Sequence, residues 1–130
     1  QVEYLAASLL DMAYHTLTEP TELDINAFEK AYFDEIGLID EIVSRYRTTY
    51  FAHITGGYAA GYYGYIWSGV LDHDAFAAFE ETSLFDQETA NRFRTEILEV
   101  TGSKDYMDMW VAFRGRPPEI EPLLRNLGLQ

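Results

Sequence analysis

Residues 51–68 read F-A-H-I-T-G-G-Y-A-A-G-Y-Y-G-Y-I-W-S, with four glycines and four tyrosines in one short stretch. From this stretch onward apolar residues recur at helical spacing, which predicts a long helix from about Ala59 to Thr82. The apolar residues that set this spacing are Tyr63, Trp67, Val70, Ala75, Phe76 and Phe79. A glycine inside a helix costs about 1 kcal/mol relative to alanine, so Gly61 and Gly64 together give up roughly 2 kcal/mol. These glycines are therefore expected to serve a purpose other than helix formation.

The predicted helix has three sides of different character. One side is a groove of small residues: Gly57, Gly61, Gly64 and Ser68. The adjacent side is a row of tyrosines at i, i+4 and i+7: Tyr58, Tyr62 and Tyr65. The third side is apolar and suited to a core: Tyr63, Trp67 and Val70. Phenol hydroxyls donate to peptide carbonyls while the rings pack on side chains, so the tyrosine row suits a bound peptide. Gly56 and Gly57 permit positive φ and an open approach to a ligand. The alternative, which the spacing alone favours, is a tight helix–helix contact with tyrosine as core filler.

Upstream of this stretch the chain also has helical spacing, interrupted by residues that begin or end helices. The predicted helices are Val2–Leu17, ending before Glu19-Pro20; Ile25–Ile36, capped by Asp24 and closed by Gly37; and a short one over Ile39–Tyr46. The segment Arg47–Thr55 is rich in β-branched and aromatic residues, so we expect it to be extended or looped.

Downstream, three more helices are expected. They are a helix capped by Asp86 and closed near Gly102; one opened by Ser103 that contains Tyr106, Met109, Trp110 and Phe113; and a last one that Pro117-Pro118 begin and Gly128 ends. The pattern contains no sustained alternation typical of a strand, no internal repeat and no flexible linker. Residues 1–130 are therefore expected to form a single all-α unit.

Composition narrows the classes of partner. The formal net charge of -13 repels phosphate backbones and anionic lipid head groups, which argues against binding to nucleic acid or to a membrane surface. With no cysteine, disulfides, thiolate catalysis and cysteine-based zinc sites are excluded. No apolar run approaches a membrane span, and the first residues lack the features of a signal peptide. We expect a cytoplasmic protein, with the periplasm as the alternative, and a processed or cut chain because it begins with Gln1.

The titratable residues do not specify a metal site. The three histidines, His15, His53 and His73, are far apart and have no H-E-x-x-H or comparable spacing. His53 is either a hydrogen-bonded structural histidine, which the sequence favours, or a ligand or acid–base group. Asp72-His73-Asp74 is interpreted as a solvated cluster rather than a weak cation site. The remaining acidic pairs are expected on solvated faces and not as a catalytic dyad: Asp34-Glu35, Asp40-Glu41 and Glu80-Glu81.

Several motifs along the whole chain resemble one known family. They are the run at 51–68, V-L-D-H-D-A-F-A-A-F at 70–79, I-L-E at 97–99, F-R-G-R-P-P at 113–118, L-L-R-N-L-G-L at 123–129, and near the start V-E-Y at 2–4 with D-M-A-Y-H at 11–15. Together they are similar to the C-terminal part of the thimet oligopeptidase family, whose bacterial members include peptidyl-dipeptidases and oligopeptidase A.

The resemblance implies roles for individual residues. Members of this family are long, mostly helical zinc peptidases that enclose a deep channel and cleave short peptides. His53, Tyr58 and Tyr65 match residues that hydrogen-bond the substrate backbone and the tetrahedral oxyanion. Tyr62 matches a further channel tyrosine, and Gly56-Gly57 match a flexible glycine-rich loop.

The resemblance also implies what this chain would not do alone. The family's zinc ligands lie in an H-E-x-x-H helix and a later glutamate helix, neither of which is in this sequence. We expect a fragment of a larger catalytic domain that binds no zinc and is inactive alone, with short peptides and the rest of that domain as partners. The parent is expected to release C-terminal dipeptides; the alternatives are an endo-acting oligopeptidase and a non-catalytic helical peptide-binding module. Arg114 and Arg116 would either grip a substrate carboxylate or, as favoured here, pair with a neighbouring helix.

Overall fold

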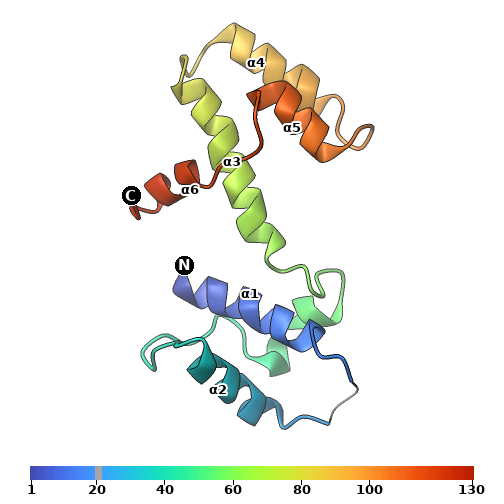
Figure 1. The fold of residues 1–130 in the computed structure, drawn as a ribbon, viewed down its shortest axis with the longest axis vertical. Coiled ribbons are helices and arrows are strands. Elements are labelled where there is room, and N and C mark those ends of the chain that lie inside the picture. Colours follow the sequence, from blue (N-terminus) through green and yellow to red (C-terminus); the bar gives the residue numbers. More distant parts are fainter. Residues whose placement is uncertain (20–21) are drawn as a thin grey trace. The chain divides into compact units, whose positions relative to one another are not determined.

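The computed structural model describes residues 1–19 and 22–130, and these form two compact units, residues 1–65 and residues 66–130 (Figure 1). All regular elements of the described residues are helical, which confirms the expected all-α class. No helix among them combines the length and the apolar character needed to cross a membrane. Pro20, at the predicted end of the first helix, lies outside the described residues.

The N-terminal unit is built on two helices, α1 (Val2–His15) and α2 (Ile25–Glu35), followed by two short 3₁₀ helices, η1 (Thr48–Tyr50) and η2 (Ala52–Thr55). The rings of Tyr14 and Phe28 stack between α1 and α2 with centroids 4.6 Å apart. Asp24 caps α2 by accepting from two backbone N–H groups, and Gly37 follows the helix at φ +72°, both as predicted. The core contains Ala7, Phe51 and Tyr62, so the tyrosine-rich stretch packs directly onto α1.

The predicted helix over Ile39–Tyr46 is wrong. A single turn closes where the Ile42 N–H donates to the Ile39 carbonyl, and the Arg45 N–H then donates to the Glu3 carbonyl on α1. Ile39 and Val43 are exposed, so the apolar residues here do not form a buried helix face. Their β-branched side chains have modest helix propensity, and the long-range bond to α1 prevails over it.

The C-terminal unit contains most of α3 (Gly64–Glu80), then α4 (Gln87–Phe93), the π-helix η3 (Arg94–Leu98), α5 (Tyr106–Arg114) and α6 (Glu121–Asn126). Three phenylalanines, one from each of α3, α4 and α5, join these helices: Phe79, Phe93 and Phe113. Asp86 caps α4 as predicted, whereas α5 begins later than predicted because Asp105, not Ser103, accepts from its first N–H groups.

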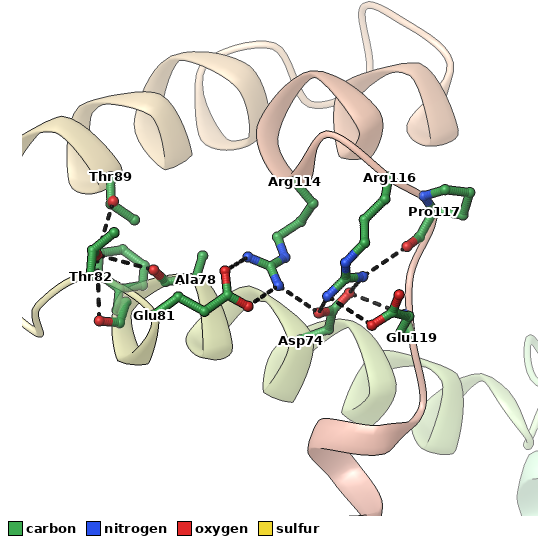
Figure 2. A network of polar contacts seen from close by, with 10 residues as sticks. Asp74, Ala78, Glu81, Thr82, Thr89, Arg114, Arg116, Pro117 and Glu119 are labelled. Carbon is green, nitrogen blue, oxygen red and sulfur yellow. Dashed lines mark hydrogen bonds and ion pairs between the residues drawn. The ribbon is translucent and has the colours of Figure 1, made fainter.

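A buried carboxylate ties the end of α5 and the following segment to α3. Figure 2 shows Arg114 and Arg116 reaching from the chain around the end of α5 to Asp74 on α3. Arg114 also pairs with Glu81, and the Glu119 N–H donates to Asp74 Oδ2 at 3.1 Å. The arginines therefore form ion pairs with a neighbouring helix, as the sequence favoured.

One surface assignment needs correction. Asp74 is fully buried, so Asp72-His73-Asp74 is not a solvated cluster, although Asp72 itself is exposed. Glu81 lies on a solvated face as predicted, with its side chain 59% exposed, and from there it pairs with Arg114. Burial alone would raise the pKa of Asp74, but the hydrogen bonds from Arg116 and the Glu119 N–H and the charges of both arginines hold that pKa below its ordinary value.

Candidate functional site

His53 lies at the centre of an aromatic cluster in the N-terminal unit. Its ring centroid is 5.0 Å from that of Tyr62, 5.7 Å from Tyr58 and 6.1 Å from Tyr65. Phe51 and Tyr46 lie on its other sides at 5.7 and 5.2 Å. The structure thus brings together His53, Tyr58, Tyr62 and Tyr65, the four side chains that the sequence singled out.

Two tyrosines of this cluster reach the surface. The rings of Tyr58 and Tyr65 stack with centroids 5.0 Å apart and planes 16° apart, and the residues are 46% and 40% exposed. Tyr62, in contrast, is only 3% exposed and packs edge-on against Phe51 and His53. Tyr62 is therefore a buried support for the cluster, while the other two present a pair of rings at the surface.

The Tyr65 phenol is held in its protonated form. A hydrogen bond with the Tyr58 phenol raises the pKa of Tyr65 to about 12, with burial and the neighbouring phenols of Tyr58 and Tyr62 acting in the same direction. This hydroxyl is a hydrogen-bond donor at neutral pH, as any tyrosine hydroxyl is, and the raised pKa keeps it protonated at alkaline pH as well.

One ring nitrogen of His53 has no partner. Its Nδ1 atom is buried, and no residue within 1–19 or 22–130 hydrogen-bonds to it. The favoured interpretation of His53, a structural histidine with its hydrogen bonds satisfied, therefore fails at this atom. A buried polar group left in this state costs about 1–3 kcal/mol.

The tyrosines meet through a turn and not along a helix, which corrects the predicted helix from Ala59. Residues 57–63 form consecutive turns and α3 begins only at Gly64. Ala60 has φ +53°, a left-handed conformation that a right-handed helix does not contain. The predicted glycine groove therefore does not form on one helix face. On the side predicted for the core, only Val70 is buried, whereas Tyr63 is 52% exposed and Trp67 is also exposed.

Gly56 and Gly57 connect His53 to Tyr58 at the surface. The Gly56 N–H donates to the His53 carbonyl, and the Ala59 N–H donates back to the Gly56 carbonyl, so the two glycines form a tight reversal. A Cβ at Gly57 would meet no atom within 4 Å, which leaves the space beside this glycine open.

Two buried carboxylates bind the chain between residues 47 and 62, and the sequence interpretation missed both. Asp11 on α1 accepts from the Ala60 and Tyr62 N–H groups, and Glu29 on α2 accepts from Arg47 and Thr48. Burial alone would raise the pKa of Glu29, but the hydrogen bonds from Thr48 and Arg47 hold that pKa below its ordinary value. A signal for Asp11 existed, since it lies on the same side of the first predicted helix as the apolar residues Ala7 and Leu10.

The described residues contain no group of three or more His, Asp or Glu side chains placed to hold a metal ion. His15 instead pairs with Asp11 at 2.9 Å, and Nδ1 of His73 donates to the Gly69 carbonyl of its own helix. Nothing in the described part of the chain forms the three-ligand site that catalytic zinc requires.

Comparison with known proteins identifies the family. The model of peptidase family M3 matches residues 2–129. The dipeptidyl carboxypeptidase of Escherichia coli is 42% identical over 98% of this chain, which covers 19% of that relative. A probable cytosolic oligopeptidase A of Arabidopsis thaliana is 54% identical over 61% of the chain, and oligopeptidase A of E. coli is 47% identical over 62%; the match covers 12% of each.

The chain thus spans about a fifth or less of the length of these curated relatives. The resemblance seen in its motifs is confirmed, since the match extends over nearly every residue. The chain belongs to peptidase family M3.

Proposed function

We propose that this chain is the substrate-binding part of the catalytic domain of a zinc peptidase that hydrolyses short peptides and releases C-terminal dipeptides. The observation that carries the proposal is the pair of exposed phenols, Tyr58 and Tyr65, beside the buried and unpartnered Nδ1 of His53. Release of dipeptides is supported by the similarity, over 98% of the chain, to a relative named dipeptidyl carboxypeptidase.

In this proposal Tyr65 acts on the transition state. Its hydroxyl, which keeps its proton at neutral pH, donates a hydrogen bond to the oxygen on which negative charge develops as the scissile carbonyl becomes tetrahedral. A donor of this kind typically contributes 10²–10³ in rate, roughly 3–4 kcal/mol. Tyr58 and His53 hydrogen-bond the substrate backbone, while Gly56 and Gly57 leave room for it to approach.

Tyr62 has a different part in the same proposal. Its ring is buried under His53 and its pKa is raised, first by burial and then by the neighbouring Tyr46 phenol. We assign it to the wall of the substrate channel, where it supports the histidine ring.

Peptidases of family M3 depend on zinc in general, and the residues described here do not supply a ligand set for it. Bound zinc would polarise the scissile carbonyl and activate water. We infer that its ligands belong to another part of the catalytic domain, and that this chain contributes hydrogen-bond donors and the shape of the channel.

The test is Tyr65→Phe in the full-length enzyme, which removes one hydroxyl and keeps the ring that stacks on Tyr58. Both kcat and kcat/KM should fall tenfold to a thousandfold with little change in binding, because an interaction made only in the transition state is lost. Tyr63→Phe, on an exposed neighbouring ring, is the matched control and should leave kcat nearly intact. Equal, small effects at both positions would show that the tyrosines are structural.

An endo-acting oligopeptidase is the second candidate. Its specific support is the higher identity, 54% over 84 residues, to a relative named probable cytosolic oligopeptidase A. Peptides with free and with amidated C-termini separate the two. An enzyme that releases dipeptides should lose most of its activity on amidated substrates, whereas an endo-acting one should cleave both forms at internal bonds.

A further inference from the structure

Asp11 is a buried carboxylate that accepts hydrogen bonds from the backbone of residues 53–65, the segment that carries the candidate site (the site segment). It is fully buried in α1. Its Oδ1 atom accepts from the Ala60 N–H at 3.0 Å, and its Oδ2 atom accepts from the Tyr62 N–H at 2.9 Å. Nδ1 of His15 lies 2.9 Å from Oδ1, so three nitrogen atoms surround this one side chain.

The backbone that Asp11 holds is in an unfavourable conformation. Ala60 has φ +53°, in the left-handed region that is unfavourable for a residue with a Cβ. Such a conformation persists only where its surroundings impose it, and these conformations concentrate at functional sites. Hydrogen bonds to a carboxylate are stronger than those between neutral groups, so the two that Asp11 accepts help to maintain the turn.

This turn sets how the two exposed phenols meet. Tyr58 lies before Ala60 and Tyr65 lies after Tyr62, so the direction of the chain at 60–62 determines whether their rings can stack at 5.0 Å. The same two bonds place the buried Tyr62 ring under His53 at 5.0 Å. Asp11 itself is remote from any ligand because it is completely enclosed.

We propose that Asp11 is a positioning residue for the Tyr58–Tyr65 pair, acting through the Ala60 and Tyr62 amides and not through contact with substrate. The expected effect on catalysis rests on the proposed function. The effect of Asp11 on the arrangement of the Tyr58 and Tyr65 rings does not depend on it. It adds a residue of α1 to a site that is otherwise built from residues 53–65.

The variant that tests it is Asp11→Asn in the full-length enzyme, which keeps the size but offers one oxygen acceptor for two N–H groups. A displaced Tyr65 should lower kcat tenfold to a hundredfold while KM changes by about twofold or less, because misplacement of about 1 Å can have effects of this size. The matched control is Asp74→Asn, which removes an equally buried carboxylate whose partners all lie within residues 66–130. It should lower stability and, assayed well below its Tm, leave kcat within about twofold.

A spectroscopic readout separates positioning from a loss of stability. Ionisation of Tyr65 is measured at pH 10.5 as the difference in ultraviolet absorbance between each protein and its Tyr65→Phe counterpart. With the pKa of about 12, only about 3% of Tyr65 is ionised, whereas the ordinary value near 10 gives about three quarters. Asp11→Asn should raise the ionised fraction toward the larger value, and Asp74→Asn should not.

The outcomes are distinct. Unchanged Tyr65 ionisation in Asp11→Asn, or the same change in Asp74→Asn, overturns the positioning role. A changed ionisation together with a catalytically silent Tyr65→Phe keeps Asp11 as a positioning residue and refutes the proposed function of Tyr65. If Asp11→Asn does not fold, the double variant Asp11→Asn/Ala60→Gly, in which glycine adopts positive φ without strain, is used for the same measurements.

Discussion

Tyr65 combines two properties that are seldom found together in one side chain. It is 40% exposed, so a ligand can reach it, and its pKa is raised to about 12, first through its hydrogen bond with Tyr58. Exposure alone would leave a tyrosine near its ordinary pKa of about 10. The second phenol thus extends the pH range over which Tyr65 remains protonated from about pH 10 toward pH 12.

The raised pKa predicts a dependence of stability on alkaline pH. The folded pKa of about 12 exceeds the unfolded value of about 10, so the folded chain retains a proton that the unfolded chain releases. This contribution to the free energy of unfolding is fully present below pH 10 and is lost as the pH rises toward 12. Urea unfolding at pH 9 and pH 11 measures it, and the fall in stability should be smaller in Tyr65→Phe than in the unchanged chain. Equal falls in both proteins would contradict the Tyr58–Tyr65 interaction.

The members of the site could be identified from sequence, but their support could not. The cost of glycine in a helix marked this stretch as unusual, but the assignment of His53, Tyr58, Tyr62 and Tyr65 to a site came from the family resemblance. Asp11 does not stand out in the same way, because its partners are backbone N–H groups 49 and 51 residues away, which leave no trace in the residue types.

At the scale of the elements, helix ends set by local capping were predicted correctly, whereas a helix start that depends on a long-range contact was not. Asp24 and Asp86 cap their helices as predicted because a cap needs only the next three residues. The helix predicted from Ala59 instead begins at Gly64, because a carboxylate on α1 holds the intervening residues in a turn. Periodicity over 59–63 could not reveal that competition.

The contact between α3 and the chain after α5 predicts a large effect of one substitution. Asp74→Asn removes the buried carboxylate that Arg114 and Arg116 share, and leaves them only the more exposed carboxylates of Glu81 and Glu119. Removing one partner of a buried ion pair costs about 3–5 kcal/mol, so the free energy of unfolding should fall by an amount of this order. Denaturant unfolding checks it, with the exposed neighbour Asp72→Asn as a control that should change stability by about 0.5 kcal/mol or less.

The lowered pKa of Asp74 also predicts how stability depends on acidic pH. Because the folded pKa is below the unfolded value, the stabilisation is present above the unfolded pKa and is lost as the pH falls through the folded one. The unchanged chain should therefore lose stability on acidification by more than Asp74→Asn does. A parallel loss in both proteins would mean that the network contributes nothing through its charges.

At the scale of the whole chain, many large apolar side chains are exposed. They occur on α1, α3, η3 and α5 and in the segment before α4, and include Leu5, Leu9, Trp67, Phe76, Phe85, Leu98 and Met107. A surface of this kind is typical of residues that pack against other protein. It agrees with a chain that spans only a fifth or less of its relatives, whose remaining length offers such partners.

We predict that the 130-residue chain by itself neither retains zinc nor hydrolyses peptides. A catalytic zinc site needs three protein ligands, and the described residues contain no such group. Metal analysis after dialysis, together with an assay on a quenched peptide, measures both properties. Stoichiometric zinc with peptide cleavage would refute the division of the site proposed above.

The link between Asp11 and the Ala60–Tyr62 turn also bears on the order in which the chain folds. Its two hydrogen bonds span 49 and 51 residues, so closing them requires ordering a long loop, whereas α1 and α2 can form from local contacts. We expect the site segment to be among the last parts of its unit to form, so that Asp11→Asn mainly accelerates unfolding and leaves the folding rate nearly unchanged. Stopped-flow unfolding and refolding would show this as a shift of the unfolding limb alone. Tyr58 and Tyr65 would then acquire their stacked arrangement only once the rest of the unit is already in place.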